Sequence, residues 1–264
     1  MRDDRYRRRE TPKVQEENEG QLEGRNALTE ALRSGRTIDK VFIASGETDR
    51  GLQRLAAQAK EAGAVVVPVD RRKLDAMSTT RAHQGVIAMA AAREYSTIDD
   101  ILQEAADRGE TPLVIICDEL SDPHNLGAIL RSGECAGAHG VIIPKRRSVG
   151  LTAVVAKASA GAVEYMKVAR VTNINAAMEE LKQKGVWVFG TAAEGSIPMY
   201  QADLTVPAAI VIGSEGDGMS RLVRQNCDVT VHIPMRGRIS SLNASAAASI
   251  LLYEAVRQRL SKEG

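Results

Sequence analysis

Aromatic residues and cysteines are both scarce in this sequence. Phe, Trp and Tyr together make up 3% of the 264 residues, so a hydrophobic core must be built mainly from Ala, Val, Ile and Leu. The three cysteines are Cys117, Cys135 and Cys227, and no two of them form a CxxC pair. This spacing argues against a zinc site and against a disulfide framework, so we expect no metal.

A dominant charge and a long apolar run are also absent. The 35 Lys and Arg residues nearly balance the 34 Asp and Glu residues, which leaves a net charge of +1. This balance gives no overall signature of nucleic-acid binding, so a contact with nucleic acid would have to be local. No apolar run reaches the length of a membrane span, and the first residues lack the apolar core of a signal peptide. We therefore expect a cytoplasmic protein without a membrane contact.

The first 111 residues divide into three parts by composition. Residues 1–20 carry charges of both signs and few apolar side chains, which predicts a disordered tail. Residues 21–95 alternate between strand-like and helix-like patterns, and they are numerous enough to form a small α/β domain that folds alone. Within it we expect helices at 26–33 and 52–62, and strands at 41–43, 65–69 and 85–90. Residues 96–111 are polar and helix-prone, and we expect them to link two domains.

Residues 112–264 form a second and longer alternating series. The continuous apolar run 113–117 is typical of a strand buried in a parallel sheet. Further strands are expected at 141–143, 186–189, 208–212 and 229–233, and helices at 125–136, 151–159, 174–184, 219–225 and 242–260. This alternation predicts an α/β domain with a parallel sheet covered by helices on both faces. In such sheets, ligands bind at the loops that leave the carboxyl ends of the strands.

The first candidate loop, residues 118–127, leaves the apolar strand and enters a helix. Asn125 is a residue type that caps helices. Arg131 lies farther along the same helix, among small and apolar residues, where an arginine usually needs an anionic or polar partner. This segment by itself fits a structural salt bridge as well as it fits a functional role.

The second candidate loop, residues 213–218, has the sequence Gly-Ser-Glu-Gly-Asp-Gly. Three glycines in six positions let the backbone approach a ligand closely. The loop is not a P-loop, because no Gly-Lys-Ser/Thr follows, and it is not the dinucleotide-binding G-x-G-x-x-G motif. An enzyme that uses a nicotinamide cofactor is therefore a distant alternative.

The third candidate loop, residues 233–245, ends a predicted strand and enters a helix rich in alanine. Small residues at the start of this helix allow close packing against other backbone. Ser241 and Asn243 stand where helix caps are expected. From this loop alone, capping is the favoured interpretation.

The three loops together are more specific than any one of them. The segments 125–131, 212–218, 233–235 and 241–245, in this order and spacing, resemble the SpoU family of RNA ribose 2′-O-methyltransferases in the SPOUT superfamily. In the first domain, Gly24-Arg25-Asn26-Ala27 and His83-Gln84-Gly85-Val86 resemble the L30e-like module with which this family binds its substrate. The two-domain layout is similar to the branch that methylates a guanosine of large-subunit (23S) ribosomal RNA.

The resemblance implies a fold, a cofactor and a set of site residues. Residues 112–264 would be a SPOUT domain with a C-terminal trefoil knot, and the cofactor would be S-adenosylmethionine. The cofactor-binding positions are Gly190, Thr191, Gly213, Ile233, Met235 and Leu242. The catalytic positions are Asn125, Arg131, Glu215, Ser241 and Asn243. Members of this family act as homodimers with the active site near the interface, so we expect a homodimer here.

Physical chemistry restricts the role of Arg131 in such a reaction. Methyl transfer to a ribose hydroxyl needs an aligned nucleophile and removal of its proton. A guanidinium group keeps its proton at neutral pH and is therefore a poor base. Our hypothesis is that Arg131 fixes the target phosphate or ribose and stabilises the emerging alkoxide. Glu215 would orient Arg131 or relay the proton.

Candidate RNA contacts are Arg25 in the first domain and the cluster Lys145, Arg146 and Arg147 after the strand 141–143. Arg236 and Arg238 make the third loop more basic than is usual in the family, and they fit phosphate contacts or solvated charges equally. The target nucleotide stays open. The alternatives are a transfer RNA or resistance-type ribosomal RNA substrate, and a non-catalytic protein that binds RNA or assists ribosome assembly.

Overall fold

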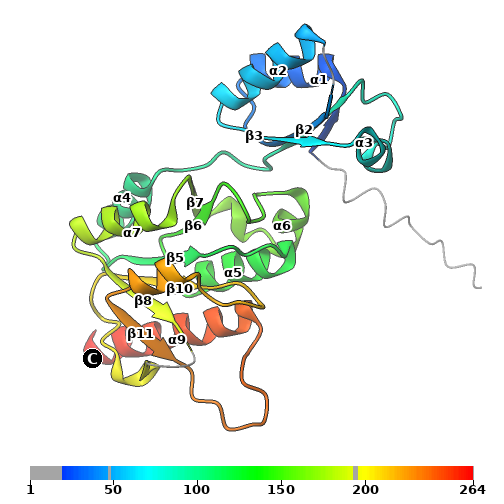
Figure 1. Ribbon diagram of the computed structural model, residues 1–264. Coiled ribbons are helices and arrows are strands. Elements are labelled where there is room, and N and C mark those ends of the chain that lie inside the picture. The colour runs from blue at the N-terminus through cyan, green and yellow to red at the C-terminus, as the bar shows by residue number, and fades with distance from the viewer. Residues whose placement is uncertain (1–19, 47–48, 193–195, 264) are drawn as a thin grey trace, which may run out of the picture.

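The first domain is built on a mixed four-stranded sheet (Figure 1). The computed structural model describes residues 20–46, 49–192 and 196–263, so the predicted tail lies outside the described residues except for Gly20. The elements of this domain are β1 (Gln21–Glu23), α1 (Arg25–Arg33), β2 (Ile38–Ala44), α2 (Arg50–Glu61), β3 (Val65–Val69), α3 (Arg71–Met77) and β4 (Val86–Ala90). The strand order is β1-β4-β2-β3, and only β2 and β3 run parallel. The predicted strands and helices are present, and β1 and α3 are additional.

Both faces of this small sheet are covered. Helices α1 and α2 pack on one face, where Leu28 and Leu52 are fully buried against Val41 of β2. Helix α3 covers the other face through Leu74, which packs with Ile87. Because aliphatic side chains fill both layers, the domain has the hydrophobic core that a unit of this size needs.

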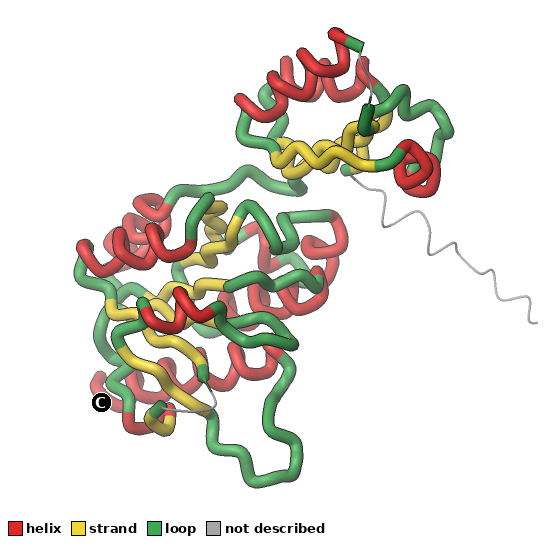
Figure 2. The backbone as a smooth tube through the Cα atoms, in the orientation of Figure 1, coloured by secondary structure: helices red, strands yellow, loops and turns green. Residues whose placement is uncertain are grey.

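The second domain is built on seven strands in the order β7-β6-β5-β10-β8-β11-β9 (Figure 2). Its strands are β5 (Leu113–Cys117), β6 (Gly140–Pro144), β7 (Lys167–Val171), β8 (Trp187–Thr191), β9 (Ile197–Pro198), β10 (Ala208–Ile212) and β11 (Val229–His232). Its helices are α4 (Ile98–Arg108), α5 (Pro123–Cys135), α6 (Ala153–Ala158), α7 (Ile174–Gln183), α8 (Arg221–Gln225) and α9 (Ala244–Glu263), with short 3₁₀ turns at Ala162–Glu164 and Met199–Gln201. Every neighbouring pair of strands runs parallel, which confirms the predicted sheet.

Alternate residues of the central strands enter two separate cores. Leu113 and Ile115 of β5 face the layer that holds α5, α6 and α9. Val114 and Ile116 face the layer that holds α4, α7 and α8. Because both faces are covered by helices, the ligand-accessible part of this sheet is the edge where the strands end. The trefoil knot implied by the family resemblance stays a prediction.

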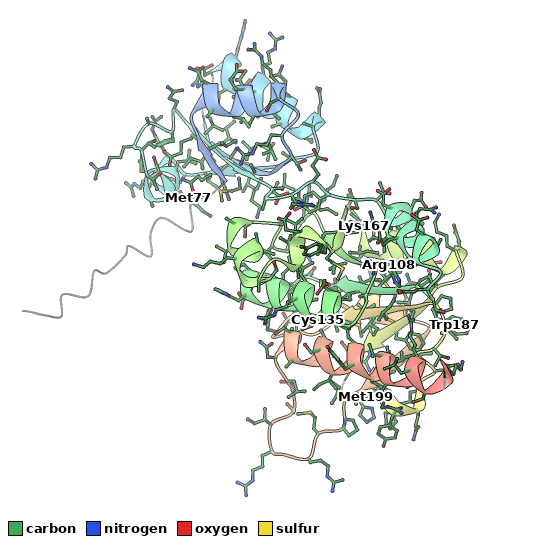
Figure 3. The ribbon with its side chains drawn as sticks, turned by 180° about the vertical axis from the view of Figure 1, so that it is seen from behind. Met77, Arg108, Cys135, Lys167, Trp187 and Met199 are labelled. Atoms are coloured by element: carbon green, nitrogen blue, oxygen red, sulfur yellow. The ribbon has the colours of Figure 1, made fainter. Side chains whose placement is uncertain are left out.

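The predicted linker, residues 96–111, contains the helix α4, which packs on the second domain. Ile98 and Ile101 are buried in the core beneath this helix. Glu104 pairs with Arg108 in α4 and with Lys167 of β7, at 2.7 and 3.4 Å (Figure 3). The connection between the domains is thus shorter than predicted. The sequence predicts the helical character of this segment. The buried apolar stripe of α4 is what attaches it to the second domain.

A buried polar network joins the two domains. Asp39 of β2 accepts a hydrogen bond at 2.7 Å from the guanidinium of Arg170, and both side chains are almost completely buried. The hydroxyl of Tyr95 donates to Asp39 at 2.8 Å and accepts from the backbone N–H of Leu151. Burial raises the pKa of Asp39, and the charge of Arg170 opposes that rise. Because a buried ion pair is costly to break, this network holds the first domain in one orientation over the second.

Among the helices of residues 20–46, 49–192 and 196–263, none is long and apolar enough to cross a bilayer.

Candidate active site

A cavity of about 770 Å³ opens at the carboxyl ends of β8, β10 and β11. Its walls come from the loops that follow these strands and from the start of α9. This volume lies in the usual range of small-molecule sites. The cavity therefore stands where a parallel sheet is expected to bind its ligand.

Five of the six predicted cofactor-binding residues line this cavity. They are Thr191, Gly213, Ile233, Met235 and Leu242. The sixth, Gly190, lies behind the wall, since a Cβ at this position would come within 2.5 Å of the Cys227 sulfur and 2.8 Å of the Met219 methyl. Gly190 therefore allows close packing beneath the cavity instead of forming its surface.

The glycine-rich loop after β10 closes into a tight hairpin. The backbones of Ser214 and Gly218 exchange two hydrogen bonds, at 3.0 and 3.1 Å. A Cβ on Gly213 would lie 2.2 Å from the carbonyl carbon of Gly218. Only glycine therefore fits at position 213, and the hairpin folds back against the end of its own strand.

Gly213→Ala is expected to lower affinity for S-adenosylmethionine about tenfold or more, since relieving such overpacking costs about 1–3 kcal/mol. The matched control is Gly216→Ala, because a Cβ there meets nothing within 4 Å. Isothermal titration calorimetry on both variants measures the difference. Equal affinities for the two variants would show that the close approach at Gly213 does not shape the cavity.

Asn125 joins the three candidate loops. This residue is 6% exposed, and its Nδ2 donates to Glu215 Oε1 at 2.5 Å. Its Oδ1 accepts from Nδ2 of Asn243 at 2.9 Å. The contacts span 90 and 118 residues of sequence, and they place α5, the hairpin and the start of α9 around one buried amide.

Asn243 combines the two roles that the sequence left open. Its Oδ1 caps α9 by accepting from the backbone N–H of Ser245 at 2.9 Å, while its Nδ2 reaches Asn125. Asn125 itself is not a cap, since α5 begins two residues earlier and Asp122 accepts from the N–H of His124 at 2.8 Å. An Asp before a Pro at the first helical position is a sequence signal that identifies this cap.

Arg131 and Ser241 have fewer contacts than the other predicted catalytic residues. Ser241 lines the cavity. Arg131 is exposed, and within residues 20–46, 49–192 and 196–263 its guanidinium has no hydrogen-bond or ion-pair partner. It follows Asn125 by six helical positions, so the two side chains leave α5 about 120° apart. The expected contact between Glu215 and Arg131 is therefore replaced by the contact between Glu215 and Asn125.

The cysteines near the cavity are buried thiols. Cys117 ends β5 and is fully buried, and Cys227 packs beneath Gly190. Burial raises the pKa of each thiol to about 12. Because the thiolate is the reactive form, this burial disfavours covalent catalysis by either cysteine at neutral pH.

The two sequence motifs of the first domain lie side by side. The backbone N–H of Gly24 donates to the carbonyl of Val86 at 3.1 Å. The guanidinium of Arg25 is held by Asp49 at 2.6 Å and by the carbonyl of Gln84 at 3.2 Å. Arg25 thus organises this surface through its internal contacts, and its role in RNA binding stays a prediction.

The basic cluster after β6 lies at an exposed turn. Arg146 is exposed, Lys145 is partly buried, and Arg147 pairs with Glu119 at 3.0 Å. Arg236 and Arg238 lie on the long loop between β11 and α9, which extends away from the sheet (Figure 1). These cations stand at the same end of the domain as the cavity, because they all follow the carboxyl ends of strands.

Two models of protein families match this chain. The model described as the SpoU rRNA Methylase family matches residues 112–253. The model described as RNA 2′-O ribose methyltransferase substrate binding matches residues 21–96. The two matches follow the two domains of the structure.

Individual relatives match over most of the chain. YacO of Bacillus subtilis (strain 168), named as a TrmH family tRNA/rRNA methyltransferase, is 48% identical over 236 residues, which are 89% of this chain and 94% of the relative. The structure of the SpoU methyltransferase AviRb from Streptomyces viridochromogenes with AdoMet shares 26% identity over 95% of both chains, with a TM-score of 0.59. The A. aeolicus TrmH/SpoU tRNA modifying enzyme is 27% identical, with a TM-score of 0.54, over 58% of this chain and 78% of its own.

Proposed function

Because this chain belongs to the SpoU rRNA methylase family, we propose that it methylates the ribose 2′-hydroxyl of a guanosine in 23S ribosomal RNA. The coarser activity is that of an RNA 2′-O-methyltransferase that uses S-adenosylmethionine. The observation that carries the proposal is the convergence of Glu215 and Asn243 on Asn125, at the rim of a cavity of fitting size.

The residues around the cavity fit the chemistry of S-adenosylmethionine. Ile233, Leu242 and Leu251 supply apolar walls for an adenine ring, and the close-packed hairpin at Gly213 presents backbone groups. The carboxylate of Glu215 on the same wall suits a cationic sulfonium. When bound, the cofactor supplies an electrophilic methyl group.

The protein's own side chains would align the ribose hydroxyl and accept its proton. Glu215 is a carboxylate at the rim and is held by the Asn125 amide, so its orientation is set before substrate arrives. Asn243 fixes the other side of that amide. Arg131 carries an exposed cation on α5, which would bind the phosphate next to the target ribose.

The first domain supports ribosomal RNA as the substrate class. It is matched by the substrate-binding model of RNA 2′-O ribose methyltransferases. The family model that matches residues 112–253 is described as an rRNA methylase, and the likeness to the A. aeolicus tRNA modifying enzyme covers only 58% of this chain. A transfer RNA substrate is the second candidate, because the name of the Bacillus subtilis relative includes both kinds of RNA.

S-adenosylmethionine at 100 times its Kd is expected to raise the melting temperature by about 5 °C or more, since saturation adds about 2.7 kcal/mol of stability. NAD at the same concentration is the control, and it should cause no shift. A shift with NAD alone would favour the nicotinamide alternative. No shift with either compound would favour a non-catalytic RNA-binding protein.

Mapping of 2′-O-methyl groups in total RNA tests the substrate. RNA from cells with and without this protein should differ at one guanosine of 23S ribosomal RNA. A difference confined to a transfer RNA would replace the proposed substrate and keep the reaction. No difference in any RNA would contradict the enzyme.

The homodimer is part of the proposal. Arg131 has no partner within the described part of its own chain, and α9, which contacts α5 through Ser249 and Ser132, exposes Tyr253 and Leu260. Light scattering of the purified protein should give twice the chain mass of 28.4 kDa. A monomer mass at micromolar concentration would contradict the dimer.

A further inference from the structure

Asp118 contacts both ends of the hairpin that carries Glu215. It stands one residue beyond β5, and it is 4% exposed. Its backbone N–H donates to the carbonyl of Ile212 at 2.8 Å, immediately before the hairpin. Its carboxylate Oδ2 accepts from the backbone N–H of Ser220 at 2.7 Å, two residues after the hairpin.

The hairpin between these two anchors behaves as one closed unit. Ser214 and Gly218 exchange two backbone hydrogen bonds, and Gly213 packs directly on Gly218. These contacts couple the position of Glu215 to the two ends of the hairpin. The direction of the Glu215 side chain is therefore set by where Ile212 and Ser220 are held.

The same short loop also holds the partner of Glu215. Asp122 caps α5 and accepts from Asn125 Nδ2 at 3.4 Å, while Asp118 four residues earlier holds the hairpin. Residues 118–122 thus hold both partners of the hydrogen bond between Asn125 and Glu215, one through Asp122 and the other through Asp118. Burial of a carboxylate costs free energy unless hydrogen bonds compensate for the lost water. Here the compensating hydrogen bond also links two parts of the site.

We propose that Asp118 is a positioning residue that holds Glu215 at hydrogen-bond distance from Asn125. This inference rests on the proposed methyltransferase function. Asp118 touches neither the cofactor cavity nor the substrate in this arrangement, since it does not line the cavity, and it acts through Ser220 and the hairpin.

Asp118→Ala is expected to lower kcat about 100-fold, because a shift of about 1 Å at a reacting centre has an effect of that size. The Kd for S-adenosylmethionine should change much less than kcat. This difference distinguishes a positioning role from a general loss of the cofactor site. Asp118→Asn keeps an oxygen acceptor for the Ser220 N–H and should restore most of the activity. Asp118→Ala with full kcat would overturn the proposal.

A double-mutant cycle tests whether Asp118 acts through Glu215. In a Glu215→Ala background, the added Asp118→Ala should change the single-turnover rate by no more than about twofold. If the rate effects of Asp118→Ala and Glu215→Ala multiply in the double variant, Asp118 acts on general stability and the inference is overturned. Transfer of tritiated methyl groups to RNA under single-turnover conditions measures the low rates of these variants.

A second pair of variants tests the N–H donor of Ser220 and leaves Asp118 in place. Ser220 has a φ of −59°, which a proline ring can adopt, so Ser220→Pro deletes the N–H and keeps the φ of this residue. Ser220→Ala keeps the N–H and is the matched control. Ser220→Pro should lose activity as Asp118→Ala does, and Ser220→Ala should keep it. Equal activity of both would overturn the inference, whereas an inactive wild-type protein would instead contradict the proposed function.

Discussion

Arg131→Lys is expected to lower kcat at least about 100-fold with little change in the Kd for S-adenosylmethionine. Loss of one preorganised donor to developing charge typically costs about 10²–10³ in kcat. Lysine keeps the positive charge and loses the planar fork that binds a phosphate or an alkoxide through two parallel hydrogen bonds. Because Arg131 lies on the exposed face of α5 and outside the cavity lining, cofactor binding should be preserved.

Arg108→Lys is the matched control for this substitution. Arg108 is another exposed helical arginine of the same domain, and it pairs with Glu104 on α4. Its conversion to lysine should leave kcat unchanged. The measurement is initial-rate methyl transfer to a ribosomal RNA fragment at saturating cofactor. Near-normal turnover of Arg131→Lys would eliminate the geometric role and leave only a point charge.

Asn125→Ala is expected to lower kcat about 1000-fold, the upper end of the effect of a single positioned donor. The substitution leaves Glu215 Oε1 and Asn243 Nδ2 without the partner that joins them. It also opens a small gap at a site that is 6% exposed. Circular dichroism and the affinity for S-adenosylmethionine should remain close to those of the parent protein, because Asn125 does not line the cavity.

Asn125→Asp distinguishes the hydrogen bond donated by this side chain from the space that it fills. The side chain keeps its size, but a carboxylate replaces the donor and repels the carboxylate of Glu215 at 2.5 Å. If donation to Glu215 is what matters, Asn125→Asp should be as inactive as Asn125→Ala. If the residue serves only to pack α5 against the hairpin, Asn125→Asp should be active and only Asn125→Ala should fail.

Strands with the strongest patterns were predicted with their full bounds. The apolar runs 113–117 and 208–212 are β5 and β10, which lie next to each other in the centre of the sheet. A strand buried on both faces has no polar positions, so its limits are visible in the sequence. Strand β7 was not predicted, because Lys167 and Arg170 interrupt its apolar pattern at the sheet edge.

Helix α4 and the contact between the domains show what local sequence patterns cannot predict. Its polar face led to a linker prediction, although Ile98, Ile101 and Ala105 form a buried stripe. The ion pair of Asp39 with Arg170 joins residues 131 positions apart. No local pattern can identify such a pair, because each residue has many equally suitable partners elsewhere in the chain.

The sequence by itself determined the α/β class, the parallel sheet, the family and the three candidate loops. These depend on local periodicity and on motifs whose residues stand close together in the chain. Only the tertiary structure decided which loop residues meet. Asn125 contacts both Glu215 and Asn243, Gly190 lies behind the cavity wall, and Arg131 is exposed on α5 outside the cavity lining. The physical reason is that strand order and helix rotation set these contacts, and both are fixed by packing across the whole domain.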